Sequence, residues 1–289
     1  MSGYELKLEK TFAYQRPPID RGYANQTLHL NLSDLAVAAR PVTPQMKELF
    51  IGGKGFALWL LWNAVTPRTR WDDPENAVCI ACGPLGGTPA YPGSGQGNAA
   101  PIAPLTCPVI DPHVGGYFGP YLKFSGFDAL EIQGASDRDV VAVVDGIDQT
   151  VQIYAATGLP EDSYRLSEVL TEHFAQGKPR NISVVSAGPG AKNTYFGCLN
   201  FSWYDPKRKR ARYKQAGRGG VGTVFAHKRL KALVARWDSG ISVDTNRPAD
   251  RERLKKVAKL HAKEIVELDP KQNEMAVIGT THLVTIMND

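Results

Sequence analysis

The sequence predicts an α+β protein whose strand-rich body is followed by a helical C-terminal segment. Up to residue 238, short apolar runs alternate with glycine and proline, which number 28 and 20 in the chain. After Trp237 the pattern changes to a long amphipathic helix over 248–268, with Pro248 in its first turn. We therefore divide the chain into 1–238 and 239–289, and we find no internal repeat.

Short apolar or alternating runs predict the strands of the body. TLHLNL (27–32) alternates as a half-buried strand does, and AVCIAC (77–82) is apolar until Gly83 ends it. Asp145 and Gly146 supply turn chemistry between two strands, which predicts a hairpin. The predicted strands cover 27–32, 77–82, 129–134, 140–146, 150–156, 181–188, 195–203 and 231–236. The predicted helices cover 44–50, 56–65, 117–127, 163–177, the start of TVFAHKRL (223–230), 248–268 and 276–289.

Composition excludes several classes of protein. The chain has 289 residues, 43% of them hydrophobic, which suffices for a sizeable core. It has no apolar run of about 18 residues, so no transmembrane helix is expected, and its N-terminal stretch lacks the apolar core of a secretory signal. Four cysteines in a chain of this length do not form a disulfide framework. We therefore expect a cytoplasmic protein.

Residues 214–223, KQAGRGGVGT, contain the G-x-G-x-x-G pattern of dinucleotide-binding turns. Such a turn follows a buried strand, whereas the residues before Gly217 are KRKRARYKQA, so NAD binding is disfavoured. The glycines would still let backbone N–H groups approach an anion, with Lys214 and Arg218 beside them. Taken alone, the motif is consistent with a phosphate-bearing ligand or with a tight turn that starts a helix.

Further glycine clusters accompany this motif in a distinctive order. They are GGKGFALWLL (52–61), GPLGGTPAYPGSGQGN (83–98), HVGGYFGPYLKFSGFDALEIQG (113–134), SAGPGAKN (186–193) and QAGRGGVGTVFAHKRLKALV (215–234). The segments GGYFG…LK…GFD…I.G and AGRGG.G.V…K.LKA are long and specific. In this order the clusters resemble the tungsten-containing aldehyde ferredoxin oxidoreductase family, over residues from about 25 to 289.

The resemblance implies a two-sheet, β-rich pterin-binding domain followed by the start of a helical domain. Family members bind tungsten, or occasionally molybdenum, through the dithiolene sulfurs of paired pterins whose phosphates magnesium links. A [4Fe–4S] cluster beside one pterin passes electrons to ferredoxin. The implied activity is oxidation of an aldehyde to a carboxylic acid. Low-potential reduction of an aromatic thioester, and a non-catalytic scaffold that has lost the cofactor, are the alternatives.

The resemblance also assigns residues to the cofactor. They lie in the loops before and after 98–113 and at the glycine motif: Gln96, Asn98, His113, Gly115, Gly116, Lys214, Gln215, Ala216, Gly217, Arg218 and Gly219. Gln96 stands where the family usually has arginine, and His113 where it commonly has asparagine. Lys214 replaces an arginine, which keeps the charge and loses the planar fork. His113 and Gln215 are the predicted magnesium contacts.

The chain also differs from the family in its length. Members are much longer, and their cluster cysteines and acid–base residues follow the segment that resembles GTTHLVTIMND. We therefore expect the catalytic residues and the iron–sulfur ligands outside this chain, on a partner polypeptide that carries the C-terminal domains. Ferredoxin or an iron–sulfur subunit is the expected electron acceptor, and a small aldehyde the expected substrate. The sequence leaves open the exact substrate, the metal, the oligomeric state, and whether the chain is a fragment or half of a split enzyme.

Two other patterns have simpler explanations. Cys79 and Cys82 form C-x-x-C, but residues i and i+3 of a strand face opposite sides, so they are predicted to be small buried residues. The basic run 207–214 is typical of a solvated loop, although it could face phosphates or an acidic electron-transfer partner. RNA binding would need exposed aromatics among the charges, and Trp203 and Tyr213 lie nearby, but we expect no nucleic-acid partner.

Overall fold

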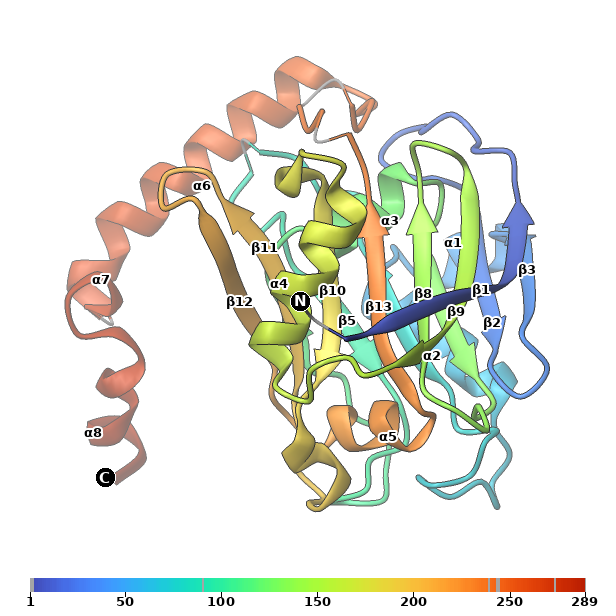
Figure 1. The fold of residues 1–289 in the computed structure, drawn as a ribbon. Helices are drawn as coiled ribbons and strands as arrows, with labels where there is room; N and C mark the ends of the chain where they lie inside the picture. Colours follow the sequence, from blue (N-terminus) through green and yellow to red (C-terminus); the bar gives the residue numbers. More distant parts are fainter. Residues whose placement is uncertain (1–2, 90, 239, 243–244, 273, 289) are drawn as a thin grey trace.

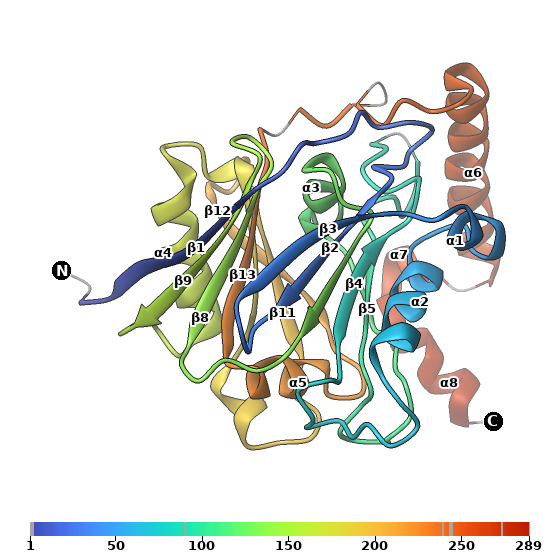
Figure 2. The same cartoon turned by 90° about the vertical axis from the view of Figure 1, so that its right-hand side faces the viewer.

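Two mixed β-sheets face each other, and helices cover their outer faces (Figure 1, Figure 2). The structure is a computed structural model that describes residues 3–89, 91–238, 240–242, 245–272 and 274–288. Both the predicted α+β class and the two-sheet arrangement implied by the resemblance are confirmed. Among the described residues, no helix combines the length and apolarity needed to cross a membrane.

The larger sheet has seven strands in the order β1-β9-β8-β13-β10-β11-β12. Its neighbours are antiparallel except for the parallel pair β13 and β8. The predicted hairpin of β8 and β9 is present, because the Asp145 carboxylate accepts bonds from the amides of Ile147 and Asp148 in the turn. The strands are β1 (Glu5–Ala13), β8 (Val140–Asp145), β9 (Thr150–Thr157), β10 (Ile182–Ala187), β11 (Leu199–Asp205), β12 (Arg210–Ala216) and β13 (Leu230–Arg236).

The smaller sheet has six strands in the order β3-β2-β7-β4-β5-β6. Strands β2 and β7 run parallel, and the other neighbours are antiparallel. The strands are β2 (Gln26–Asn31), β3 (Ala36–Pro41), β4 (Val78–Cys82), β5 (Gly97–Ala100), β6 (His113–Val114) and β7 (Ala129–Gln133). Strand β6 is therefore one edge of this sheet, and β12 is one edge of the other.

Three apolar layers hold the sheets and helices together. The central layer lies between the sheets and includes the fully buried Phe118 and Phe124 of α3. Helix α2 covers the outer face of the smaller sheet, and α4 covers that of the larger sheet. Helix α4 begins where the Asp162 carboxylate caps the amides of Tyr164 and Arg165. The helices are α1 (Pro44–Leu49), α2 (Lys54–Ala64), α3 (Phe118–Phe124), α4 (Ser163–Ala175), α5 (Val221–His227), α6 (Arg251–Gln272), α7 (Met275–Ile278) and α8 (His282–Asn288). Short 3-10 turns are η1 (Pro179–Asn181), η2 (Pro189–Lys192) and η3 (Gly279–Thr281).

The structure corrects several predicted strands. The basic run is not simply a loop, because Lys207–Lys209 form a turn and Arg210–Lys214 belong to the edge strand β12. An edge strand can expose charged side chains along its length, so charge did not exclude a strand here. The strand predicted over 195–203 begins only at Leu199. Strands β1, β3, β5 and β6 were not predicted.

The C-terminal helices also differ from prediction. Helix α6 begins at Arg251, after Pro248, and the Asp250 carboxylate accepts a bond from the Arg253 amide at 2.8 Å. The helix predicted over 276–289 is divided into α7 and α8, because Gly279 has a φ of +64° that an α-helix does not permit. Figure 1 shows α6, α7 and α8 as an arm that stands away from the sheets beyond β12. The division at residue 238 remains a prediction.

Lys228 is a buried lysine whose lowered pKa leads to a testable prediction about stability. Its ammonium donates to the carbonyls of Pro74 at 3.1 Å and Gly134 at 3.0 Å, and burial lowers its pKa from 10.5 to about 8. Because an unfolded lysine keeps the higher pKa, the free energy of unfolding should rise by roughly 3 kcal/mol as pH increases from 8 to 10.5. Lys228→Met should lack this rise when denaturant unfolding is measured across that range. Equal slopes in the two proteins would contradict the prediction.

Candidate cofactor site at a sheet edge

The edges of the two sheets, β6 and β12, meet beside the glycine loops. Strand pairing places Asn98 opposite His113, so the loops that end at these strands are adjacent. A Cβ on Gly115 would lie 3.9 Å from Cγ of Lys214 in β12, and one on Gly95 would lie 3.1 Å from the carbonyl oxygen of Gly116. The structure therefore brings together the segments around 95–98, 113–116 and 214–219 that were predicted to bind the cofactor.

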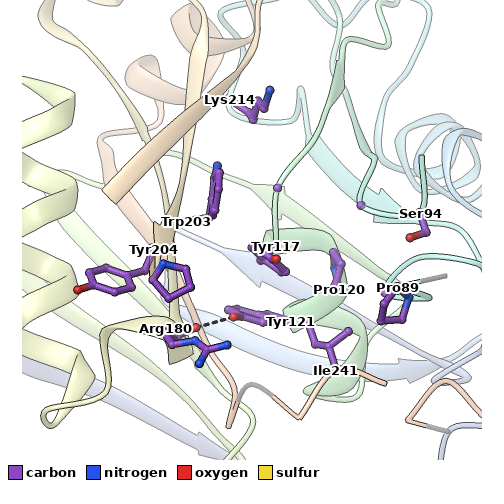
Figure 3. Close-up of a pocket in the computed structure, with 14 residues that line it drawn as sticks. Pro89, Ser94, Tyr117, Pro120, Tyr121, Arg180, Trp203, Tyr204, Lys214 and Ile241 are labelled. Atoms are coloured by element: carbon purple, nitrogen blue, oxygen red, sulfur yellow. Dashed lines mark hydrogen bonds between the residues drawn. The ribbon is translucent and has the colours of Figure 1, made fainter. Parts of the chain in front are cut away.

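A cavity of about 520 Å³ opens at this edge, and we call it the edge cavity. Figure 3 shows Lys214 at one end and Arg180 at the other, with aromatic side chains between them. Of the eleven predicted residues, Gly116 and Lys214 line the cavity itself. Its lining consists of Gly87, Pro89, Ser94, Gly95, Gly116, Tyr117, Pro120, Tyr121, Arg180, Trp203, Tyr204, Pro206, Lys214 and Ile241.

Aromatic rings form one wall of the edge cavity. The rings of Tyr117 and Tyr121 stack with centroids 5.7 Å apart, and Tyr117 lies 5.8 Å from Trp203. Tyr121 donates its hydroxyl to the carbonyl of Arg180, and its burial raises the pKa of that phenol. The sequence does not mark these residues as part of a site. Tyr117 belongs to the quoted GGYFG segment, but nothing local to Arg180 or Trp203 marks them as its neighbours.

Different structural constraints explain why glycine occupies these positions of the motif. Gly219 has a φ of +63°, and a Cβ would lie 2.6 Å from side-chain atoms of Ile110. A Cβ on Gly222 would lie 2.2 Å from the carbonyl oxygen of Cys198. Gly217, by contrast, is exposed, and in the described part of the chain no atom lies within 4 Å of a Cβ placed there. Packing explains Gly219 and Gly222, whereas the open space at Gly217 leaves its backbone free to be approached by a ligand.

The charged side chains near Gly217 have no partner in the described part of the chain. Lys214 and Arg218 are exposed, and no ion pair or side-chain hydrogen bond holds either of them there. Gln215 differs, because its side-chain amide donates to Oδ1 of Asn200 at 3.2 Å. Alternation along β12 places Lys214 and Gln215 on opposite faces of the strand. Two cations thus remain without a partner in the described structure, Lys214 in the wall of the edge cavity and Arg218 next to Gly217, while the Gln215 side chain is tied to the layer that contains α4.

Asn98 and His113 lie on the α2 side of β5 and β6. Asn98 is buried and donates to the carbonyl of Asp111 at 2.8 Å, while its own Oδ1 has no partner in the described structure. His113 is exposed, with Nε2 3.8 Å from the Asp111 carboxylate, which also pairs with Lys54 at 2.5 Å. The predicted magnesium contacts His113 and Gln215 therefore have side-chain partners from different layers. Their assignment as magnesium contacts remains a prediction.

The remaining predicted residues are peripheral to the cavity. Gln96 is exposed at the end of its loop, where its backbone amide donates to the carbonyl of Gly93 at 3.1 Å. Ala216 is fully buried in the central layer, so any contact with a ligand must come from its backbone. Helix α5, which follows the motif, has only seven residues, and we assign its N-terminus no binding role of its own.

The cysteine pair and the basic run contribute no further site. Cys79 and Cys82 are buried, and burial raises the pKa of both thiols, so both are neutral at physiological pH. Among the described residues, His, Cys, Asp and Glu form no cluster of three that could hold a metal. The aromatics near the basic run pack in separate pairs: Trp203 lies beside Tyr117 in the wall of the edge cavity, and Tyr213 packs against Tyr164 at 4.3 Å. Trp203 and Tyr213 are each only partly exposed, so they do not form the exposed row of stacking rings that RNA binding requires.

Comparison with known proteins agrees with this arrangement. Residues 27–237 match the model of the aldehyde ferredoxin oxidoreductase N-terminal domain. The tungsten-containing aldehyde ferredoxin oxidoreductase of Pyrococcus horikoshii is 29% identical over 93% of this chain and 41% of its own length. The aliphatic sulfonate oxidoreductase WOR-like subunit of Pyrococcus furiosus is 26% identical over 85% of this chain and 39% of its own length. This chain thus spans about two-fifths of these relatives.

A solved structure shares the fold. The active-site complex BamBC of benzoyl coenzyme A reductase, bound to 1,5-dienoyl-CoA, superposes with a TM-score of 0.66 and 25% identity. The similarity covers 75% of this chain and 31% of that one. The family match covers most of the chain, and it includes both glycine loops and the glycine motif, whose Lys214 lines the edge cavity. The chain belongs to the aldehyde ferredoxin oxidoreductase family, and residues 27–237 form its N-terminal domain.

Proposed function

We propose that this chain forms the pterin-binding part of a tungsten or molybdenum oxidoreductase that oxidises an aldehyde to a carboxylic acid. One observation carries the proposal: Gly217, whose backbone is open to approach, is flanked in sequence by two cations that have no partner in the described structure, Lys214 in the wall of the edge cavity and Arg218. Backbone N–H groups and cations without protein partners are what a phosphate-bearing cofactor requires. The residues present therefore fit a pterin phosphate.

The bound metal–pterin group would supply the two-electron oxidation chemistry, in which water provides the oxygen and a [4Fe–4S] cluster carries electrons to ferredoxin. The chain's own residues would bind and orient that group. Arg218 and Lys214 would neutralise phosphate charge, and Gly217 would allow close backbone contact. Tyr117 and Trp203 would present aromatic faces to a planar ring, since stacked rings favour such contacts. Catalytic acid–base groups are expected outside this chain.

Metal and pterin content test this function directly. Protein purified from its native source should contain tungsten or molybdenum together with pterin, measured by elemental analysis and by fluorescence of the oxidised pterin. Absence of both would favour the scaffold alternative, which the replacement of the family's usual arginine by Gln96 suggests. A cytoplasmic location and a magnesium link between the pterin phosphates belong to the same proposal.

Reduction of an aromatic thioester is the second candidate. It is supported by the similarity to the benzoyl coenzyme A reductase complex, whose solved structure contains a dienoyl-CoA. Substrate profiling of metal-loaded protein separates the two reactions. Electron transfer to a ferredoxin on addition of aldehydes would support the first, whereas consumption of reductant on addition of an aroyl thioester would support the second.

We further propose that a polypeptide carrying the rest of the family's length packs against the C-terminal arm. Apolar side chains are exposed on α6, α7 and α8, including Val266 at 73%, Val277 at 83% and Met287 at 82%. The relatives extend well beyond the portion that this chain matches. Such a partner would account for exposed apolar residues that the described part of this chain leaves uncovered.

Association with that partner should depend on the arm. Val277→Asp and Val284→Asp should each weaken co-purification of the partner at least about tenfold, because each buries a charge in an apolar contact. Ile147→Asp, at an exposed turn between β8 and β9, is the matched control and should leave association unchanged. A stable chain that purifies from its native host without any partner would contradict the proposal.

A further inference from the structure

Lys123 is a fully buried lysine whose charge is held by main-chain carbonyls. Its ammonium donates to the carbonyl oxygens of Gly83 at 2.7 Å, Gly86 at 2.8 Å and Pro84 at 3.0 Å. Burial lowers the pKa of Lys123, with the nearby Cys82 and Asp128 opposing that shift. Burying an ammonium costs several kcal/mol unless its hydrogen bonds are satisfied. The carbonyls around Lys123 satisfy them, so the ammonium holds one end of the glycine-rich loop 83–96 in place.

The other side of loop 83–96 lines the edge cavity. Gly87, Pro89, Ser94 and Gly95 all contribute to its wall (Figure 3). The loop is closed on itself, because the amide of Gly87 donates to the carbonyl of Ser94 at 2.8 Å and the Ser94 hydroxyl donates to the carbonyl of Thr88 at 2.5 Å. A change in the part held by Lys123 would therefore shift the cavity wall as well.

The same loop anchors the C-terminal arm at two points. Asn246, which is buried just before α6, accepts a bond from Lys123 at 3.3 Å and donates to the carbonyl of Pro84 and the hydroxyl of Thr88 at 2.6 and 2.9 Å. In α6, Nδ1 of His261 lies 2.8 Å from the Tyr91 hydroxyl. Lys123, loop 83–96 and the start of the arm thus share one hydrogen-bond network.

We propose that Lys123 and Asn246 are positioning residues that couple the order of loop 83–96, and hence the wall of the edge cavity, to the docking of the C-terminal arm. Nothing in the proposed function requires such coupling. The alternative is that Lys123 stabilises the loop alone and Asn246 stabilises the linker alone. The two ideas differ because coupling is reciprocal: releasing the arm from the loop must loosen the loop, and loosening the loop must release the arm, whereas fraying of α6 that leaves these contacts in place does not affect the loop.

Amide hydrogen exchange tests the coupling in the purified protein together with any subunit that co-purifies. Asn246→Ala should accelerate exchange roughly threefold to tenfold at the amides of loop 83–96 and also in α6, since it removes the bonds that join the segment before α6 to Lys123 and to the loop. Lys123→Met should accelerate exchange in the loop at least about tenfold and raise exchange in α6 as well. The amides of β8 and β13 report whether the body is intact, and they should be unchanged.

Asp250→Ala is the matched control. It removes the cap of α6 but none of the bonds to the loop, so it should accelerate exchange in the first turn of α6 only. The proposal is overturned if Asn246→Ala leaves loop 83–96 unchanged, or if Asp250→Ala loosens the loop as much as Asn246→Ala does. Should Lys123→Met fail to fold, Asn246→Ala decides the question by itself.

A second comparison connects the coupling to the cofactor, and this part rests on the proposed function. If pterin binds in the edge cavity, metal-loaded wild-type protein should show slower exchange in α6 than metal-free protein, and Asn246→Ala should abolish that difference. If the loop and α6 are coupled in metal-free protein, and the native protein never contains pterin, then the proposed function is refuted. The role of Lys123 and Asn246 in coupling is then still supported. Metal loading that slows α6 equally in both proteins would overturn the coupling alone.

Discussion

Arg218→Ala is expected to lower metal and pterin content roughly ten- to a hundredfold, because a charge-assisted contact to phosphate is worth about 1.5–3 kcal/mol. Lys214→Ala should have a smaller effect, since an ammonium grips one oxygen where the guanidinium fork can grip two. Both side chains are exposed and make no ion pair in the described structure, so neither substitution should reduce folding stability by more than about 0.5 kcal/mol. Elemental analysis, pterin fluorescence and thermal melting of the same preparations measure both effects.

Lys207→Ala separates specific contact from general attraction. Lys207 belongs to the same basic run, but it lies in the turn between β11 and β12 and away from the glycine motif. Its removal should leave metal content unchanged, whereas Gln96→Arg should maintain or raise it. If Lys207→Ala lowers metal content as much as Arg218→Ala, the effect is long-range electrostatics and the assigned site is wrong.

Substitutions at Gly217 and Gly219 should give opposite results for fold and cofactor. Gly217→Ala should change the free energy of unfolding by less than about 1 kcal/mol, because the structure leaves open space around its Cβ, yet it should strongly reduce pterin retention. Gly219→Ala should destabilise the protein by roughly 1–3 kcal/mol, because it adds a Cβ at a φ of +63° and 2.6 Å from Ile110. Denaturant unfolding of metal-free protein and pterin content of loaded protein measure the two effects.

Gly217 and Gly219 also differ in how clearly a substitution tests contact with the cofactor. Gly219→Val would be an ambiguous test of cofactor contact, because Gly219 packs on Ile110 and loss of pterin in that variant would have two explanations. Gly217 has no such contact. Full retention of pterin by Gly217→Ala would show that the backbone there does not approach the cofactor.

The sequence by itself determined most helices and strands and the order of the glycine loops. Apolar alternation, short apolar runs and turn residues are local properties, so β2, β4 and the β8–β9 hairpin could be predicted from their own residues. The loops could likewise be assigned to a family because their glycines serve close backbone approaches that few other residues allow. Strand β12 was not predicted, because a run of basic residues is typical of a loop. Edge strands also tolerate exposed basic residues.

Only the tertiary structure decided which side chains share the site. Alternation along β12 directs Lys214 toward the edge cavity and Gln215 toward Asn200, although the two are adjacent in sequence. Arg180 and Tyr121 lie far apart in the chain and meet only because η1 and α3 pack at the same end of the larger sheet. The buried charge of Lys123 likewise depends on carbonyls from loop 83–96. Such contacts form when apolar surfaces that are distant in the sequence are buried together. This long-range contribution to the folding free energy leaves no periodic pattern in the sequence.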